Sequence, residues 1–332
     1  MLVLSNTCGL SLYLDGYGSR SLDSPALCSH LVMVSLQQMS TQATPSEQWF
    51  LAKGHKIECR TRPLVMGVVN VTADSFYDGG RYLKPERAIA HAMDLVAQGA
   101  DLIDIGGEST RPGSHVVSEQ AELDRVLPVV EELARRISVP ISIDTTKSRV
   151  AQCALDHGAS IINDVSAMRQ DPAMASVIAR SGAAVVLMHM QGTPQTMQLA
   201  PSYADVRSEV VLFLAERIQH ALSAGFARTN IVLDPGFGFG KLIFHNLELL
   251  RGLSSLLTLN RPLLVGLSRK AFIGTILDKS VEHREWGTAA AVALAVDRGA
   301  RIIRVHDVAM MMDVVKVASA ASRAWPSQRE EE

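Results

Sequence analysis

The sequence is poor in cysteine, in aromatic residues and in net charge. Its four cysteines stand apart from one another and from histidine at any zinc-site spacing, which argues against a disulfide framework and a structural zinc site. Isolated cysteines are typical of a reducing compartment, so a cytoplasmic location is expected. The formal net charge of −2 provides no basic surface, so nucleic acid is not an expected partner.

Long apolar runs are also absent. The longest candidates, residues 183–190 and 289–296, are far shorter than the roughly 18 residues that cross a bilayer. The first residues lack the basic region and continuous apolar stretch of a signal peptide. No membrane association is therefore expected.

The composition changes along the chain and divides it into three parts. Residues 1–46 are rich in Ser, Leu and Thr without a sustained period, and are predicted to be a poorly ordered extension. An alternative is that translation starts later, at Met33 or Met39. Residues 47–324 are predicted to form one catalytic domain, and residues 325–332 a polar tail.

Short, nearly all-apolar runs alternate with helical patterns through the central part. Such runs, about 4–8 residues long, are typical of parallel strands buried on both faces. Helices are predicted over 85–98 and 118–137, where apolar residues recur on one face. The predicted strands are residues 63–69, 101–105, 140–144, 160–163, 184–188, 230–234, 262–267 and 301–305.

This alternation predicts an α/β fold, and two observations favour a single-domain (β/α)8 TIM barrel over an open doubly wound sheet. The strands number eight. Polar residues follow nearly every strand, whereas an open sheet would gather them at one switch point. The barrel would bring together Asn70, Asp104, Asp144, Asn163, Met188, His189, Asp234, Ser268, Arg269, Lys270, Arg304 and His306.

The polar residues at these strand ends divide by charge. Any one of them could instead cap the following helix, but their convergence predicts a pocket for a polar, partly anionic ligand. Acids and amides such as Asp144, Asn163 and Asp234 suit a heterocycle with an amide edge and an exocyclic amine. The cations after the last two strands, Arg269, Lys270, Arg304 and His306, occupy the usual phosphate site of this fold, and Arg111 offers a further fork for phosphate oxygens.

The glycine-rich segment 236–241 is not a nucleotide-binding loop. Pro235 and Leu242 replace residues that a phosphate-binding P-loop requires. We interpret the segment as a flexible loop in which Phe239 lines the mouth of the barrel or packs within the loop. His189 is expected to make a supporting hydrogen bond, and His245 with Asn246 to organise the start of a helix.

The strand ends also carry a set of motifs that strongly resembles the dihydropteroate synthases over roughly residues 50–320. The motifs are Met66-Gly-Val-Val-Asn-Val-Thr-Ala-Asp-Ser-Phe76 with Asp78-Gly-Gly80, Asp104-Ile-Gly-Gly-Glu-Ser-Thr-Arg-Pro-Gly113, Ile143-Asp-Thr-Thr-Lys147, Ile162-Asn-Asp-Val165, Met188-His-Met-Gln-Gly-Thr-Pro194, Asp234-Pro-Gly-Phe-Gly-Phe-Gly-Lys241, Ser268-Arg-Lys270 and Arg304-Val-His-Asp307. The resemblance implies a homodimeric transferase that joins 6-hydroxymethyl-7,8-dihydropterin diphosphate to p-aminobenzoate with the help of Mg2+, and that sulfonamides would inhibit.

The resemblance also implies roles for individual residues. The pterin would be held by Asp144, Asn163, Asp234 and Lys270, with Asp104 and Met188 nearby. The diphosphate would be held by Arg304 and His306, and by Asn70 through the metal. Thr110, Arg111, Pro112, Phe239 and Ser268 would surround p-aminobenzoate, and Gly266 completes the substrate-binding set. Asp74, Arg111 and Lys270 are the expected catalytic residues, with Asp74 steadying the developing cation or the incoming amine.

Two departures and two rival functions remain open at this point. Ala73 stands where the family usually has Pro, and Tyr77 where a small residue is common, which leaves the first loop less restricted. One rival is the pterin-binding domain of a methyltransferase, against which Arg111, Arg304 and His306 argue because that domain has no diphosphate to release. The other is a non-catalytic paralogue that binds pterin.

Overall fold

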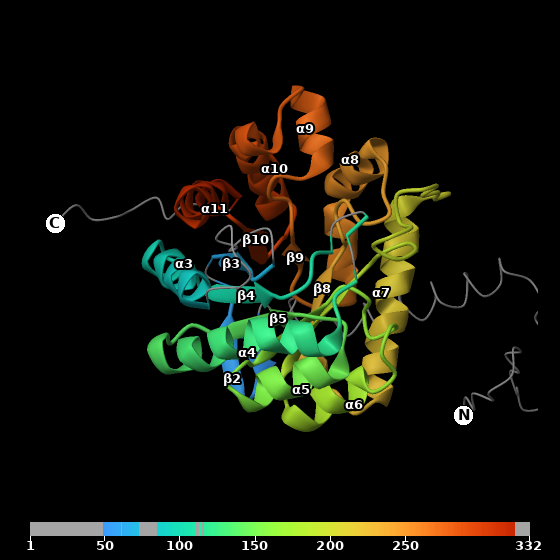
Figure 1. Cartoon of the computed structure of the whole chain (residues 1–332). Coiled ribbons are helices and arrows are strands. Elements are labelled where there is room, and N and C mark those ends of the chain that lie inside the picture. Colours follow the sequence, from blue (N-terminus) through green and yellow to red (C-terminus); the bar gives the residue numbers. More distant parts are fainter. Residues whose placement is uncertain (1–48, 61, 73–84, 111–112, 115, 323–332) are drawn as a thin grey trace, which may run out of the picture. The chain divides into compact units, whose positions relative to one another are not determined.

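The computed structural model describes residues 49–322 except 61, 73–84, 111–112 and 115 (Figure 1). These residues belong to one compact unit, Ser46–Glu332. The predicted extension 1–46 and the predicted tail 325–332 lie outside the described residues.

Eight parallel strands form the central sheet. They are β3 (Leu64–Asn70), β4 (Leu102–Gly106), β5 (Ile141–Asp144), β6 (Ile161–Asp164), β7 (Ala184–Met188), β8 (Ile231–Asp234), β9 (Leu264–Val265) and β10 (Ile302–Val305). Their order in the sheet is β8-β7-β6-β5-β4-β3-β10-β9. A parallel bridge between Leu233 and Leu263 brings the two edges together, so the sheet closes into a barrel.

Every strand lies where the apolar runs predict one. Most strand residues are buried, because helices cover the outer face and side chains fill the interior. β9 is shorter than the predicted run 262–267. Pro262 has no N–H for the ladder, although its carbonyl still accepts from Leu233 N at 3.0 Å. Pairing with β10 therefore includes only Leu264 and Val265.

Helices surround these strands and confirm the predicted (β/α)8 barrel (Figure 1). None of the helices that the structure describes is long and apolar enough to cross a lipid bilayer. They are α3 (Pro85–Ala97), α4 (Glu119–Arg136), α5 (Ser148–Asp156), α6 (Met174–Ser181), α7 (Val206–Ser223), α8 (Ile243–Arg251), α9 (Ala271–Leu277), α10 (Glu285–Asp297) and α11 (Val308–Ser322), with 3-10 turns η1 (Arg228–Asn230), η2 (Leu253–Leu259) and η3 (Val281–His283).

Helix α4 shows why the periodic segments fold as predicted. Ser118 caps its start, since the hydroxyl accepts from Ala121 N at 3.2 Å. Leu123, Val126 and Leu133 are buried on the face toward the sheet, and burial of such side chains contributes roughly 1.5–3 kcal/mol each. The cap and the apolar stripe together fix the helix against β4.

A two-stranded hairpin that the sequence analysis did not predict packs against the first residues of the barrel strands. It consists of β1 (Trp49–Ala52) and β2 (His55–Glu58), paired antiparallel. Phe50, Ala52 and Cys59 join the buried cluster at the start of the strands. Arg261, 2% exposed, donates to the carbonyls of Ile231 and Trp49. The hairpin closes the amino end of the barrel and leaves the carboxyl end for the site.

Candidate active site

The strand register brings the predicted polar residues to one edge of the sheet. Asn70 at the end of β3 lies opposite Gly106 of β4, and Gly106 lies opposite Asp144 of β5. Asp144 in turn lies opposite Asn163 of β6. Met188 and Asp234 are partners at the ends of β7 and β8. Because parallel strands share a direction, all of these residues face the carboxyl end of the barrel.

Arg304 of β10 joins the acids of two other strands. Its Nε donates to Asp104 Oδ2 at 2.6 Å, and its Nη2 donates to Asp144 Oδ2 at 3.0 Å. Asn163 Nδ2 also donates to Asp104 Oδ2, at 3.1 Å. Asp104 is fully buried, whereas 21% of the Arg304 side chain is exposed. Two carboxylates and one carboxamide therefore form a buried cluster, and the Arg304 guanidinium covers the side of the cluster that is partly exposed.

Burial changes the proton affinity of two of these acids. The pKa of Asp144 is raised to about 7, because loss of hydration outweighs the opposing effect of Arg304 and the neighbouring Asp104 also raises it. Burial also raises the pKa of Asp234 to about 6, against the Gly236 N–H and the nearby Lys270. Both carboxyls therefore change charge close to neutral pH, as groups in a functional site often do.

The raised pKa of Asp144 predicts how stability depends on pH. The folded protein holds the proton of Asp144 more tightly than the unfolded chain does. The stabilisation that this proton gives to the folded state is therefore fully present below the pKa of Asp in the unfolded chain, near 3.9. It is lost as the pH rises through about 7. The free energy of unfolding of the wild type minus that of Asp144→Asn should therefore fall as the pH rises. Urea unfolding at pH 4.5 and 7.5 measures this difference, and a difference that rose with pH would contradict the account.

The loop after β8 places an aromatic ring beside the Lys270 ammonium. Asp234 Oδ1 accepts from Gly236 N at 2.7 Å, which begins the loop. Phe239 packs against a buried cluster of Val165, Met188, Met190 and Met197, and Lys270 Nζ lies 4.3 Å from the centre of its ring. The Phe239 side chain thus packs against apolar residues on one side and contacts the Lys270 ammonium with the face of its ring.

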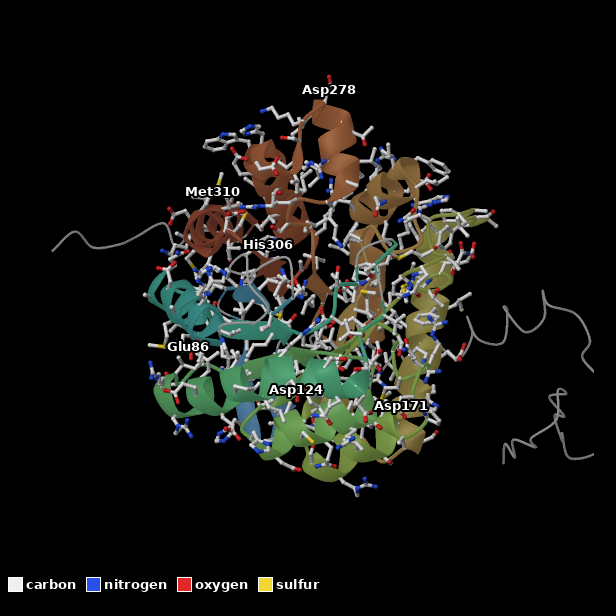
Figure 2. The ribbon with its side chains drawn as sticks, in the orientation of Figure 1. Glu86, Asp124, Asp171, Asp278, His306 and Met310 are labelled. Atoms are coloured by element: carbon white, nitrogen blue, oxygen red, sulfur yellow. The ribbon has the colours of Figure 1, made fainter. Side chains whose placement is uncertain are left out.

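The ends of β9 and β10 also meet. Ser268 Oγ lies 3.0 Å from His306 Nδ1 and accepts from His306 N at 3.3 Å. His306 follows the end of β10 (Figure 2). Arg269 is paired with Asp307 through two hydrogen bonds of 2.6 and 3.1 Å. Ser268 and His306 therefore lie beside the end of the strand that carries Arg304, as predicted, while Arg269 is paired with Asp307.

The remaining predicted site residues differ in how they are placed. Asn70 and Thr110 are half-buried. A Cβ added to Gly266 would meet nothing within 4 Å, so this glycine faces open space. Asp74, Arg111 and Pro112, together with Ala73 and Tyr77, lie outside the described residues.

One buried and one partly buried cation near the site were missing from the predicted set. Lys241 is 3% exposed, and its Nζ lies 2.9 Å from His189 Nδ1, which agrees with the supporting role predicted for His189. Lys147 pairs with Glu108 at 2.5 Å and with the fully buried Glu122. Glu108 also accepts from Val117 N at 2.9 Å, so this cluster anchors the loop after β4.

The predicted roles of His245 and Asn246 are confirmed by their hydrogen bonds. His245 Nδ1 accepts from Leu242 N at 3.1 Å. Asn246 Nδ2 donates to the carbonyl of Leu242 at 2.8 Å, while its Oδ1 accepts from Gly238 N at 2.7 Å. Both side chains therefore fix the start of α8 to the end of the glycine loop.

Comparison with known proteins shows the family to which the chain belongs. The family model described as pterin binding enzyme matches residues 66–306. The dihydropteroate synthase of Escherichia coli strain K12 is 45% identical over 271 residues, covering 82% of this chain and 96% of the relative. This chain belongs to the dihydropteroate synthase family.

Solved structures of dihydropteroate synthases share the fold as well. That of Yersinia pestis, solved as a sulfonamide drug complex, superposes with a TM-score of 0.78 at 45% identity, covering 82% of this chain and 98% of its own. That of Xanthomonas albilineans in complex with 7,8-dihydropteroate gives a TM-score of 0.74 at 43% identity, with the same coverage of 82% and 98%. The likeness extends over the whole barrel of the dihydropteroate synthases.

Proposed function

We propose that this chain condenses 6-hydroxymethyl-7,8-dihydropterin diphosphate with p-aminobenzoate to give 7,8-dihydropteroate and pyrophosphate. The observation that carries the proposal is the bridge from Arg304 to Asp104 and Asp144. This bridge joins two carboxylates that can bind a heterocycle to a guanidinium that can bind a diphosphate. The E. coli relative named dihydropteroate synthase and the complex of the X. albilineans enzyme with 7,8-dihydropteroate support the same reaction.

The acids and amide at the strand ends would bind the pterin ring. Asp234 and Asp144 can accept N–H groups from the amide edge and the exocyclic amine, and Asn163 can both donate and accept. Asp104 Oδ1 is buried and has no hydrogen-bond partner among the described residues. A ligand N–H would satisfy this acceptor, whose isolation is otherwise unfavourable.

The cations on the other side would bind the diphosphate. Arg304 uses Nε and Nη2 for the two acids, which leaves Nη1 available to a phosphate oxygen. His306 follows the same strand two residues after Arg304 and lies beside Ser268. A guanidinium that contacts both the pterin acids and the diphosphate would hold the breaking C–O bond in a fixed place.

The reaction needs charge stabilisation more than a nucleophile from the protein. The methylene C–O bond breaks as its electron pair leaves with pyrophosphate, and the pterin ring delocalises the positive charge. The amine of p-aminobenzoate then forms the new C–N bond and loses a proton. Arg304 and His306 would stabilise the departing anion, and Lys270 beside Phe239 would face the second substrate.

The residues also fit Mg2+ held mainly by the substrate. The described residues contain no group of three or more His, Cys, Asp or Glu side chains that could form a protein cage for a metal. The carboxamide of Asn70 at the end of β3 is an oxygen ligand of the type that Mg2+ accepts alongside phosphate oxygens and water. When bound there, the ion would neutralise charge on the leaving pyrophosphate.

Pyrophosphate release tests the proposed reaction. Purified protein should release pyrophosphate only when the pterin diphosphate, p-aminobenzoate and Mg2+ are all present. Binding of pterin without release would instead support the non-catalytic paralogue. Transfer of a methyl group to or from a bound pterin, without pyrophosphate release, would support the methyltransferase alternative.

Asp74 provides a prediction about the transition state. We expect Asp74→Asn to reduce turnover by about 100-fold, because the carboxylate would stabilise the cation or the incoming amine. Steady-state rates with both substrates measure the effect. The exposed Asp94 on α3, whose side chain accepts from Gln98 just after that helix, supplies the control variant Asp94→Asn. Unchanged turnover in Asp74→Asn would refute the assignment.

We also propose that the protein is a homodimer formed through the helices after β8, β9 and β10. Large apolar side chains are exposed there, including Phe244, Ile276, Trp286 (70% exposed), Leu294 and Val317 (72% exposed). The helix α10, which carries Trp286 and Leu294, packs against α8, α9 and α11, and exposed apolar surface marks an interface where it is contiguous.

Charge placed on this surface should separate the subunits. We expect Trp286→Glu to convert the dimer to a monomer, since burying an unpaired carboxylate opposes association. Analytical ultracentrifugation measures the change. Val116→Glu, at a similarly exposed position before α4, should leave the dimer intact. Trp286→Glu that remained dimeric would place the interface elsewhere.

We further propose that the protein acts in the cytoplasm. Cys59 and Cys153 are both free, which suits a reducing compartment. Fractionation of the cells that produce it, followed by detection of the chain, tests this location.

A further inference from the structure

Lys241 is the most deeply buried lysine that the structure describes, and its ammonium lies between two loops. Its Nζ lies at hydrogen-bond distance from four acceptors, namely the Gly236 carbonyl at 2.9 Å, the Phe239 carbonyl at 3.0 Å, His189 Nδ1 at 2.9 Å and, at 3.4 Å, the His189 carbonyl. An ammonium has three donors, so these contacts use all of its hydrogens. The lysine folds back onto the glycine loop that precedes it.

The His189 ring that accepts from Lys241 is a neutral imidazole. Burial lowers the pKa of His189 far below its usual range, and the cations of Lys241 and Arg169 lower it further. The neutral ring can therefore present Nδ1 as an acceptor. Because His189 follows β7, Lys241 links the loop after β8 to the loop after β7.

The glycines allow the two loops to touch. A Cβ on Gly236 would lie 1.9 Å from the His189 carbonyl oxygen, and one on Gly240 would lie 2.5 Å from that of Gln191. Both glycines have positive φ, 69° and 60°, which side chains disfavour. These close approaches limit the shapes that the loop can take. Lys241 is a second donor to the Gly236 carbonyl, which also accepts from Phe239 N at 3.1 Å, and it is a donor to the Phe239 carbonyl.

The same loop carries the apolar wall of the second-substrate site. Phe239 is the residue whose carbonyl Lys241 binds, and the ammonium of Lys270 rests on its ring at 4.3 Å. Gly238, also within the loop, packs against Lys270, since a Cβ there would lie 3.2 Å from Lys270 Cδ. The backbone of Asp234 lies in the β7–β8 ladder, although its carboxylate also accepts from Gly236 N of the loop at 2.7 Å.

We propose that Lys241 is a positioning residue for p-aminobenzoate, which acts by holding the loop that places Phe239. Lys241 contacts no substrate in this role. The inference rests on the proposed function, because it concerns the second substrate of that reaction. It predicts separate effects on the two substrates, since the pterin acids lie on strands and Phe239 lies on the loop.

Steady-state and binding measurements on Lys241→Met test the proposal. Methionine keeps the length of the side chain and removes every donor. We expect the KM for p-aminobenzoate to rise about 10- to 100-fold, the loss expected for hydrogen bonds from a buried charge. The Kd of the pterin diphosphate, measured by calorimetry without p-aminobenzoate, should change less than about threefold. Lys56→Met on the hairpin, whose lysine is half exposed, is the matched control.

A double variant shows whether Lys241 acts through Phe239. Phe239→Leu should itself raise the KM for p-aminobenzoate, and adding Lys241→Met should then raise it little further. Equal loss of affinity for both substrates, or additive effects in the double variant, would overturn the proposal. If Lys241→Met does not fold, Lys241→Gln, which keeps an N–H donor, is judged by the same criteria. Failure of both to fold would also overturn it, as would an unchanged KM.

The wild-type protein separates this inference from the proposed function. No pyrophosphate release by the wild type would refute the proposed reaction itself. Release by the wild type, together with equal changes for both substrates in Lys241→Met, would refute only the role of Lys241.

Discussion

Arg304→Met is expected to reduce kcat/KM for the pterin diphosphate by about 10²- to 10³-fold. The guanidinium bridges Asp104 and Asp144, and removing one partner of a buried ionic group leaves the other charges uncompensated, at about 3–5 kcal/mol. The variant also loses the phosphate contact that we propose for Nη1. Steady-state kinetics with saturating p-aminobenzoate measure the effect.

Two other variants show whether the geometry of Arg304 is what matters. Arg304→Lys keeps the positive charge but cannot reach both acids with a planar fork, so it should lie between the wild type and Arg304→Met. Arg149→Met removes an exposed arginine that pairs with Glu119 on the surface and should have almost no effect. If Arg304→Met kept wild-type kcat/KM, the bridge would have no part in binding or reaction.

Asp234→Asn is expected to weaken binding of the pterin by about 10²- to 10³-fold. The substitution keeps an oxygen that can accept from Gly236 N, as Asp234 Oδ1 does at 2.7 Å, so the loop after β8 should retain its shape. It replaces the anionic acceptor by a neutral amide. Each hydrogen bond to a charged group contributes about 1.5–3 kcal/mol, and two ligand N–H groups would lose part of that energy. Calorimetric titration with the pterin measures the Kd.

An exposed acid provides the comparison for Asp234. Asp124 lies on the outer face of α4 (Figure 2) and bonds only to Gln120 among the described residues. Asp124→Asn should bind the pterin as the wild type does. If Asp234→Asn bound the pterin with the wild-type Kd, the Asp234 carboxylate would not be part of the pterin site and could not be the main acceptor for the heterocycle.

The barrel was predictable because each of its strands is buried on both faces. A run such as Ala184–Met188 contains only apolar residues, and its length fits a strand and not a helix. The hairpin β1–β2 was missed since its strands are four residues each and lie in a segment without a strong period. Its turn at Lys53 and Gly54 has positive φ at both residues, 48° and 79°. A Lys-Gly pair is a weaker hairpin signal than Asn-Gly.

The strand-end residues of the site were predictable from topology alone. Once the strands are parallel and adjacent, the register must place Asp144 beside Asn163 and Met188 beside Asp234. The contacts that cross the barrel could not be predicted this way. Arg304 and Asp104 are 200 residues apart, and pairing of the last strand β10 with the first strand β3 brings β10 close to β4.

The ion pairs and hydrogen bonds of Lys241 and Lys147 are the part of the site that the sequence did not reveal. Lys241 follows three alternating glycines, a pattern that could equally precede a lysine exposed to solvent. Its role depends on positive φ at those glycines and on the carbonyls that they bring together. Lys147 similarly depends on Glu108 and Glu122, which lie on different elements. Such networks arise from tertiary packing and carry no local signal.

Formation of 7,8-dihydropteroate from p-aminobenzoate labelled with 15N on its amine tests the central claim most directly. Purified protein with the pterin diphosphate and Mg2+ should yield dihydropteroate that retains the label, with one pyrophosphate for each product molecule. Asp234→Asn should form far less product at the same substrate concentrations. Wild-type protein that binds the pterin diphosphate but forms no labelled product would contradict the proposed reaction.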